Sequence, residues 1–153
     1  MSAERPPAMV RCLEARARLA DPAPELRRAR ARSVRGEAVW RRRLERYERG
    51  DAMIVALSAR AVIERPQQGS QPLHYCDEAV WVDRTTVPRV LAERLRELAL
   101  REFAPVADGL RDRGVLTRAG ERALTVELSV DPAVAGRLCT PAPQGTPESD
   151  RAE

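Results

Sequence analysis

Histidine, cysteine and acidic residues gather in one short segment, and their types and spacing could do chemistry. His74 is the only histidine in the chain, and Cys76 follows two residues later. Residues two apart on a strand share a face, so the imidazole and the thiol could meet. Such a pair would suit a cysteine nucleophile with a histidine base, or half of a metal site. A structural zinc site needs four ligands, and no further Cys or His has a suitable spacing.

Three carboxylates lie close to this pair, around a tryptophan at position 81: Asp77, Glu78 and Asp83. Paired carboxylates perform general acid–base catalysis when their environments separate their pKa values. Acidic residues are also common at turns and strand edges without any such role. The chain lacks a GxxxxGK[ST] loop, a GxGxxG fingerprint and a GxSxG elbow. We therefore expect no metal and no cofactor, and we keep an enzyme built around His74 and Cys76 as an alternative.

Arginine supplies every basic side chain, and its distribution is uneven. Residues 1–50 contain 14 Arg against 7 Asp and Glu, whereas residues 51–153 contain 13 Arg against 16 Asp and Glu. A GC-rich, actinobacterial genome would favour Arg over Lys through codon composition alone. The functional interpretation is selection for guanidinium groups, which bind phosphates and carboxylates bidentately.

The basic segment offers a candidate surface for nucleic acid. Nine of its arginines fall in an expected helical region, and we assign them as candidate phosphate ligands: Arg27, Arg28, Arg30, Arg32, Arg35, Arg41, Arg42, Arg43 and Arg46. On helices these residues cover more than one face, so part of the charge must face solvent. Phosphate contact with release of counterions is one interpretation. Pairing of the same arginines with the acidic remainder of the chain is the other.

Hydrophobic periodicity predicts the elements that position these residues. Helices are expected at 8–20, at 25–49 in two pieces separated near Gly36, and at 84–114 with a kink or second segment at Pro105. Alternating patterns predict strands at 52–64, at 73–83 with a bulge near Asp77 and Glu78, and at 123–130. A polar loop at 65–72 would join the first two strands.

This order predicts an α+β fold, in which a small antiparallel sheet of about three strands is packed by helices. We expect residues 1–36 to be a basic, partly flexible helical arm, residues 37–131 to be the α+β domain, and residues 132–153 to be a disordered, Pro-rich tail. Three strands leave exposed edges, so a homodimer formed through an edge is an expected assembly.

Bulk properties restrict the environment in which such a chain would act. The chain has 153 residues and three dispersed cysteines without a CxxC motif. This pattern argues against a disulfide framework and suits a reducing compartment. No segment approaches the length of a membrane span, and the first residues lack the apolar core of a signal peptide. We expect a cytoplasmic protein that does not bind membranes.

The run YERGDAMIVALSARAVI, from Tyr47 to Ile63, combines a Tyr-x-x-Gly-Asp helix end with an alternating strand. Val80-Trp81-Val82 and a long charged helix ending at Gly114 follow it. This arrangement resembles a family of small actinobacterial proteins that are often carried by phages and plasmids. The resemblance covers roughly residues 40–114, implies the same order of elements and carries over no activity.

The sequence therefore favours a non-enzymatic accessory or regulatory protein that acts by protein–protein contact, with a protein partner or as a homodimer. A nucleic-acid-binding accessory that uses the Arg-rich helices is the alternative. The first needs an apolar patch or a free strand edge, and the second needs an exposed, contiguous arginine surface.

Overall fold

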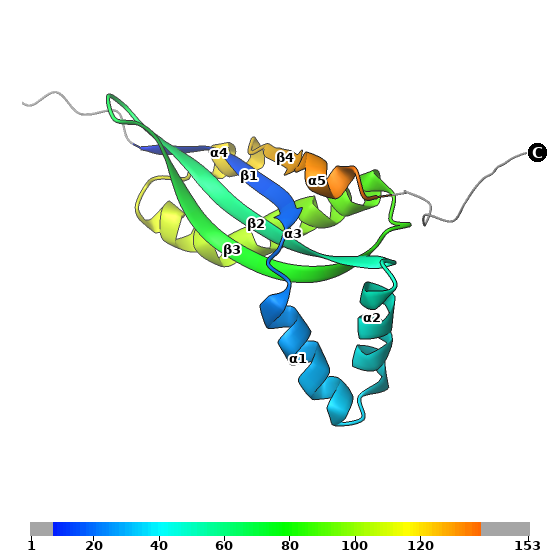
Figure 1. The fold of residues 1–153 in the computed structure, drawn as a ribbon. Helices are drawn as coiled ribbons and strands as arrows, with labels where there is room; N and C mark the ends of the chain where they lie inside the picture. The colour runs from blue at the N-terminus through cyan, green and yellow to red at the C-terminus, as the bar shows by residue number, and fades with distance from the viewer. Residues whose placement is uncertain (1–7, 139–153) are drawn as a thin grey trace, which may run out of the picture.

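The computed structural model describes residues 8–138, in which a long helix covers one face of a four-stranded sheet and a helical hairpin projects from the sheet (Figure 1). In chain order the elements are β1 (Met9–Leu19), α1 (Ala23–Val34), α2 (Ala38–Glu48), β2 (Ala52–Arg65), β3 (Gly69–Asp83), α3 (Pro88–Asp112), α4 (Arg118–Arg122), β4 (Val126–Val130) and α5 (Pro132–Ala135). The α+β class is confirmed. The sheet, however, has four strands instead of about three.

The order across the sheet is β3-β2-β1-β4. β2 is antiparallel to both β1 and β3, whereas β1 and β4 run parallel, so the sheet is mixed and not purely antiparallel. The strand that comes first in the chain is therefore an inner strand, paired on both sides.

The expectation of a helix over residues 8–20 is wrong, because these residues form β1. Leu13, Ala15 and Ala17 are buried on the core side, whereas Arg16 and Arg18 are exposed on the other. Ala, Leu and Arg all favour helices, but pairing with two neighbouring strands overrides that weak preference. The Arg-rich helices are consequently not an N-terminal arm. They are inserted between two adjacent strands, and the sheet contains residues from both sides of the expected boundary at residue 36.

Two helices separated near Gly36 were expected, and α1 and α2 confirm this. Gly36 has a φ of 89° in the turn between them, and Gly50 has a φ of 80° after α2. These left-handed conformations are accessible to glycine at little steric cost, so both helices can end in tight turns.

β2 and β3 form a long hairpin, and the expected alternation in β2 holds from Val55 to Ala61, whereas Ile54 and Val62 on the other side of the strand are buried as well. The connection is shorter than expected, because β3 already begins at Gly69. The bulge also lies elsewhere: Ala59 pairs with Cys76 and Arg60 with His74, which leaves Tyr75 as the extra residue. Asp77 and Glu78 are paired regularly, with Ser58 and Leu57.

α3 supplies the layer that covers the sheet. Its buried residues are Leu91, Leu95, Leu98, Ala99, Phe103, Ala107 and Leu110. The Tyr75 hydroxyl donates a hydrogen bond of 2.6 Å to the Ala99 carbonyl and ties the bulge of β3 to this helix. α3 continues as one helix through Pro105, which lies on its exposed side. The opposite face of the sheet carries exposed polar side chains, among them Arg16, Arg60 and His74.

The final expected strand is confirmed as β4, although it begins later, after the short helix α4. Part of the expected tail is ordered, because α5 buries Val134 against the core. The remainder of that tail, residues 139–153, lies outside the described residues. Across residues 8–138, no helix combines the length and apolar character that crossing a bilayer requires.

Truncation of one leucine tests how much of the stability depends on the packing of α3. Leu95 is 0% exposed, whereas Leu100 on the same helix is 48% exposed. We expect Leu95→Ala to lower the free energy of unfolding by about 2–5 kcal/mol, because the truncation leaves a cavity. Leu100→Ala should change it by less than about 0.5 kcal/mol. Urea denaturation followed by circular dichroism measures both, and equal effects would contradict this packing.

Candidate functional site

All nine candidate arginines lie in the α1–α2 hairpin, which projects away from the sheet (Figure 1). Seven of the nine side chains are exposed, and Arg32 and Arg46 are half-buried. The fold therefore brings together the two groups of arginines that the sequence separates at Gly36.

Few of these arginines are neutralised by carboxylates. Arg46 binds Asp83 of β3 at 2.9 Å. Arg28 and Arg32 bind acidic residues of the hairpin itself, Glu25 at 3.6 Å and Glu37 at 3.3 Å. Within residues 8–138, the other six have no carboxylate at ion-pair distance: Arg27, Arg30, Arg35, Arg41, Arg42 and Arg43. The arginines are thus not held against the acidic remainder of the chain, apart from Arg46.

Aromatic residues fix the hairpin to the sheet. Trp81 of β3 makes edge contacts with Trp40 and Tyr47 of α2, with ring centroids 6.3 and 5.9 Å apart. The Trp81 Nε1 also donates a hydrogen bond of 3.2 Å to Glu25 of α1. One indole therefore contacts both helices, and edge-to-face pairs of this kind add to the stabilisation from buried area.

Trp40 also organises the arginines around it. The guanidinium groups of Arg28, Arg32 and Arg43 lie 5.3, 5.2 and 4.7 Å from the centre of its ring. A cation over an indole face is attracted by the negative charge of that face. Ala29 is fully buried between the helices, and Leu44 is 9% exposed. The hairpin thus has a small core of its own and a defined arrangement of its charges.

The candidate pair of His74 and Cys76 is not brought together. Cys76 pairs with the buried Ala59 and packs against the core, whereas His74 pairs with the exposed Arg60. Because Ala59 and Arg60 are adjacent on one strand, their partners lie on opposite faces of the sheet. Burial raises the pKa of the Cys76 thiol, and nearby acidic groups raise it further. A protonated thiol is a poor nucleophile.

The three candidate carboxylates do not form one group, and each contacts a different basic residue. Asp77 accepts a hydrogen bond of 3.1 Å from His74 Nε2 when that nitrogen is protonated. Glu78 lies 3.9 Å from Arg101 of α3, and Asp83 binds Arg46. Ion pairs of this exposed kind are common surface features. The geometry gives no pair of carboxylates that share a reacting atom.

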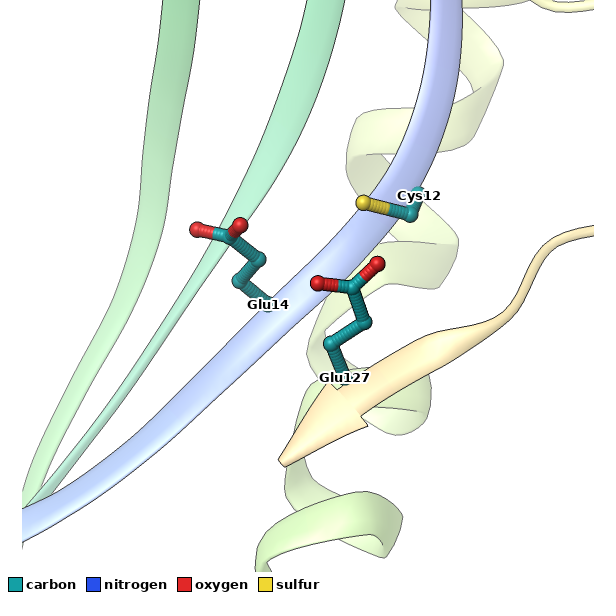
Figure 2. A group of neighbouring side chains, drawn as sticks. All are labelled: Cys12, Glu14 and Glu127. Carbon is teal, nitrogen blue, oxygen red and sulfur yellow. The ribbon is translucent and has the colours of Figure 1, made fainter. Parts of the chain in front are cut away.

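The fold reveals one cluster that the sequence did not predict: Cys12 and Glu14 of β1 with Glu127 of β4 (Figure 2). Their potential ligand atoms all lie within 4.8 Å of one another. Burial is the largest cause of a raised pKa of the Cys12 thiol, and Glu14 already accepts a hydrogen bond of 2.7 Å from Arg60. The thiol is a soft metal ligand and the two carboxylates are hard ones, and Arg60 partly neutralises Glu14. This combination fits an ion-pair network better than a metal centre.

Two arginines on the exposed face of the sheet are paired with carboxylates, in contrast to most of the hairpin arginines. Arg16 donates two hydrogen bonds to Asp131, at 2.8 and 3.0 Å, and this contact holds the pKa of Asp131 below its ordinary value. Arg60 is paired with Glu14. Arginines without a carboxylate at ion-pair distance also occur elsewhere in residues 8–138, among them Arg18, Arg89 and Arg96. Six of them lie together in the α1–α2 hairpin, however, which we take as the candidate functional site.

Comparisons with protein-family models, with curated proteins and with solved structures find no match to this chain. The resemblance described from residues 40–114 stays a prediction. The functional argument therefore depends on the geometry and charge of the site itself.

Removal of the indole of Trp81 tests whether it holds the hairpin on the sheet. We expect Trp81→Ala to accelerate amide hydrogen exchange in α1 and α2 by about tenfold or more, because two edge-to-face aromatic pairs contribute roughly 1–3 kcal/mol. Exchange in α3 should not change. Val39→Ala is the matched control, because Val39 lies in the same hairpin and is 51% exposed. Equal acceleration in α3, or none in the hairpin, would show that Trp81 has no such role.

Proposed function

We propose that this protein is a nucleic-acid-binding accessory protein, and that the exposed arginines of the α1–α2 hairpin contact the phosphate backbone. The observation that carries the proposal is the set of six hairpin arginines without a carboxylate at ion-pair distance in residues 8–138.

The net charge of the hairpin supports contact with a polyanion. Residues 23–49 contain 10 Arg and 4 Glu and no Asp. Arginine binds phosphate oxygens bidentately, and each neutralised phosphate releases condensed counterions. The gain from counterion release makes such binding strong at low salt and weak at high salt.

The composition of the hairpin supports recognition of the backbone over recognition of a particular sequence. Residues 23–49 contain no Asn or Gln, the side chains that read adenine bidentately. Phosphate contacts set position and affinity but do not themselves specify sequence. We therefore propose binding with little sequence preference, in the cytoplasm of a cell that carries the protein on its chromosome or on a mobile element.

A regulatory role through protein–protein contact is the second candidate, and one observation favours it. β3 is an edge strand of 15 residues, and its outer side has no partner strand within residues 8–138. An unpaired edge can accept a strand from another chain, including a second copy of this one. The enzyme alternative has no comparable support, because His74 and Cys76 lie on opposite faces of the sheet.

Charge removal at matched positions tests the proposed function. We expect the change of Arg30, Arg35, Arg41 and Arg42 to Ala to weaken duplex binding at least tenfold and to reduce the slope of log K against log salt by up to about 3.6. The control variant changes four exposed body arginines to Ala: Arg89, Arg96, Arg113 and Arg118. Fluorescence anisotropy with labelled duplex DNA and duplex RNA, over a salt series, measures both.

Substitution is the appropriate change here, because deletion of residues 1–36 would remove the inner strand β1 together with α1. The proposal fails if the intact protein binds neither duplex at low salt. It fails as well if the control variant loses as much affinity as the hairpin variant, since net charge alone would then account for binding.

A further inference from the structure

A cleft with a volume of about 400 Å³ lies between α2 and the first turns of α3, beside the end of the edge strand β3. Arg43 and Arg46 line it from α2, and Arg94 lines it from α3. The hairpin is joined to the body of the protein at this cleft, so a ligand there would touch both.

The charge of the cleft is unbalanced. Its lining includes three arginines and a single carboxylate, Asp83. Asp83 is already occupied, because its Oδ1 accepts hydrogen bonds from Nε and Nη2 of Arg46 at 3.1 and 2.9 Å. Neither Arg43 nor Arg94 has a carboxylate at ion-pair distance in the part of the chain that the structure describes. Two guanidinium groups from different elements thus remain available to one anion.

Part of the wall of the same cleft is apolar and aromatic. This part includes Trp81, Val82, Val90 and Leu91. The side chain of Val90 is exposed, at 47%, and the hydrogen bond from Trp81 Nε1 to Glu25 fixes the orientation of the indole. Apolar surface combined with a few charged groups is typical of small-molecule sites, and a volume of a few hundred Å³ is sufficient for one. A duplex is far too large for it.

We propose that this cleft binds one nucleotide, with its phosphate between Arg43 and Arg94 and its base against Trp81 and Val90. The inference rests on the proposed function, because we expect the nucleotide to be an unpaired end of a strand that the hairpin holds. Arg43 joins the two surfaces: it lines the cleft, and it also lies 4.7 Å from the centre of the Trp40 ring. Base stacking on an aromatic side chain and phosphate binding by arginine are sequence-independent.

Tryptophan fluorescence gives a direct readout of this cleft. The chain contains two tryptophans, and both lie at this junction: Trp81 in the wall of the cleft and Trp40 beneath Arg43. The full chain is titrated with adenosine monophosphate, with a 5′-phosphorylated single-stranded oligonucleotide and with the same oligonucleotide lacking its phosphate. We expect a saturable change with the phosphorylated oligonucleotide, and at least tenfold weaker binding without the phosphate.

The variant for this test is Arg94→Ala, and the matched control is Arg96→Ala, an exposed arginine on the same helix that does not line the cleft. Arg94→Ala should weaken binding of the phosphorylated oligonucleotide at least tenfold, whereas Arg96→Ala should change that affinity less than twofold. A response to adenosine monophosphate that also depends on Arg94 supports the same phosphate site with a free nucleotide as its source. No response to any phosphorylated probe, or equal loss in both variants, would overturn the proposal.

The same variants separate this proposal from the proposed function. Arg94→Ala should leave duplex binding within twofold of the original protein, because the four hairpin arginines tested above lie outside the cleft lining. If the intact protein binds no duplex but binds the phosphorylated oligonucleotide in an Arg94-dependent way, the proposed function is rejected and the cleft proposal is kept. If the intact protein binds duplex but Arg94→Ala does not change binding of the phosphorylated oligonucleotide, the cleft proposal is rejected and the proposed function is kept.

Discussion

The arrangement of the charged hairpin depends on one constraint, the hydrogen bonding of its two ends to neighbouring strands. β1 leads into α1 and β2 follows α2, and Leu19 pairs with Val55 across these strands. The Ala20 amide donates to the Ile54 carbonyl at 3.1 Å, and the Arg84 amide, just after β3, donates to the Asp51 carbonyl at 3.0 Å. Because both ends are fixed one strand spacing apart, the helices must leave the sheet together. Trp81 then fixes the orientation in which they leave.

Concentration of arginine on this hairpin opposes its own stability, because like charges repel. Only three of its arginines bind a carboxylate: Arg28 binds Glu25, Arg32 binds Glu37 and Arg46 binds Asp83. Cation–π contacts with Trp40 compensate three arginines of the hairpin, and exposure to solvent screens the others. A charged surface of this kind is what the proposed contact with phosphates requires.

The local part of this fold is predictable from sequence, and the long-range part is not. Alternation in β2, the leucine spacing in α3 and the glycine at position 36 each act within a few residues, so their patterns identify the elements. β1 alternates as well, but Ala15, Arg16 and Ala17 also suit a helix, and only pairing with β2 and β4 decides between the two. Likewise the bulge at Tyr75 separates His74 from Cys76, and the contact of Trp40 with Trp81 joins residues far apart in sequence. The nine candidate arginines are close together in the sequence, whereas their place between two adjacent strands is visible only in the fold.

The central claim is that the hairpin arginines, in their fixed arrangement, bind phosphates. The most direct measurement is an NMR spectrum of the arginine Nε–Hε groups of the full chain, recorded with and without a short duplex at low salt. The account predicts that the Nε–Hε signals of four hairpin arginines change chemical shift, or exchange more slowly with water, on binding: Arg30, Arg35, Arg41 and Arg42. The signals of Arg16 and Arg60, which are paired on the sheet, should not change. Shifts confined to arginines of the sheet and α3, with the hairpin signals unchanged, would contradict it.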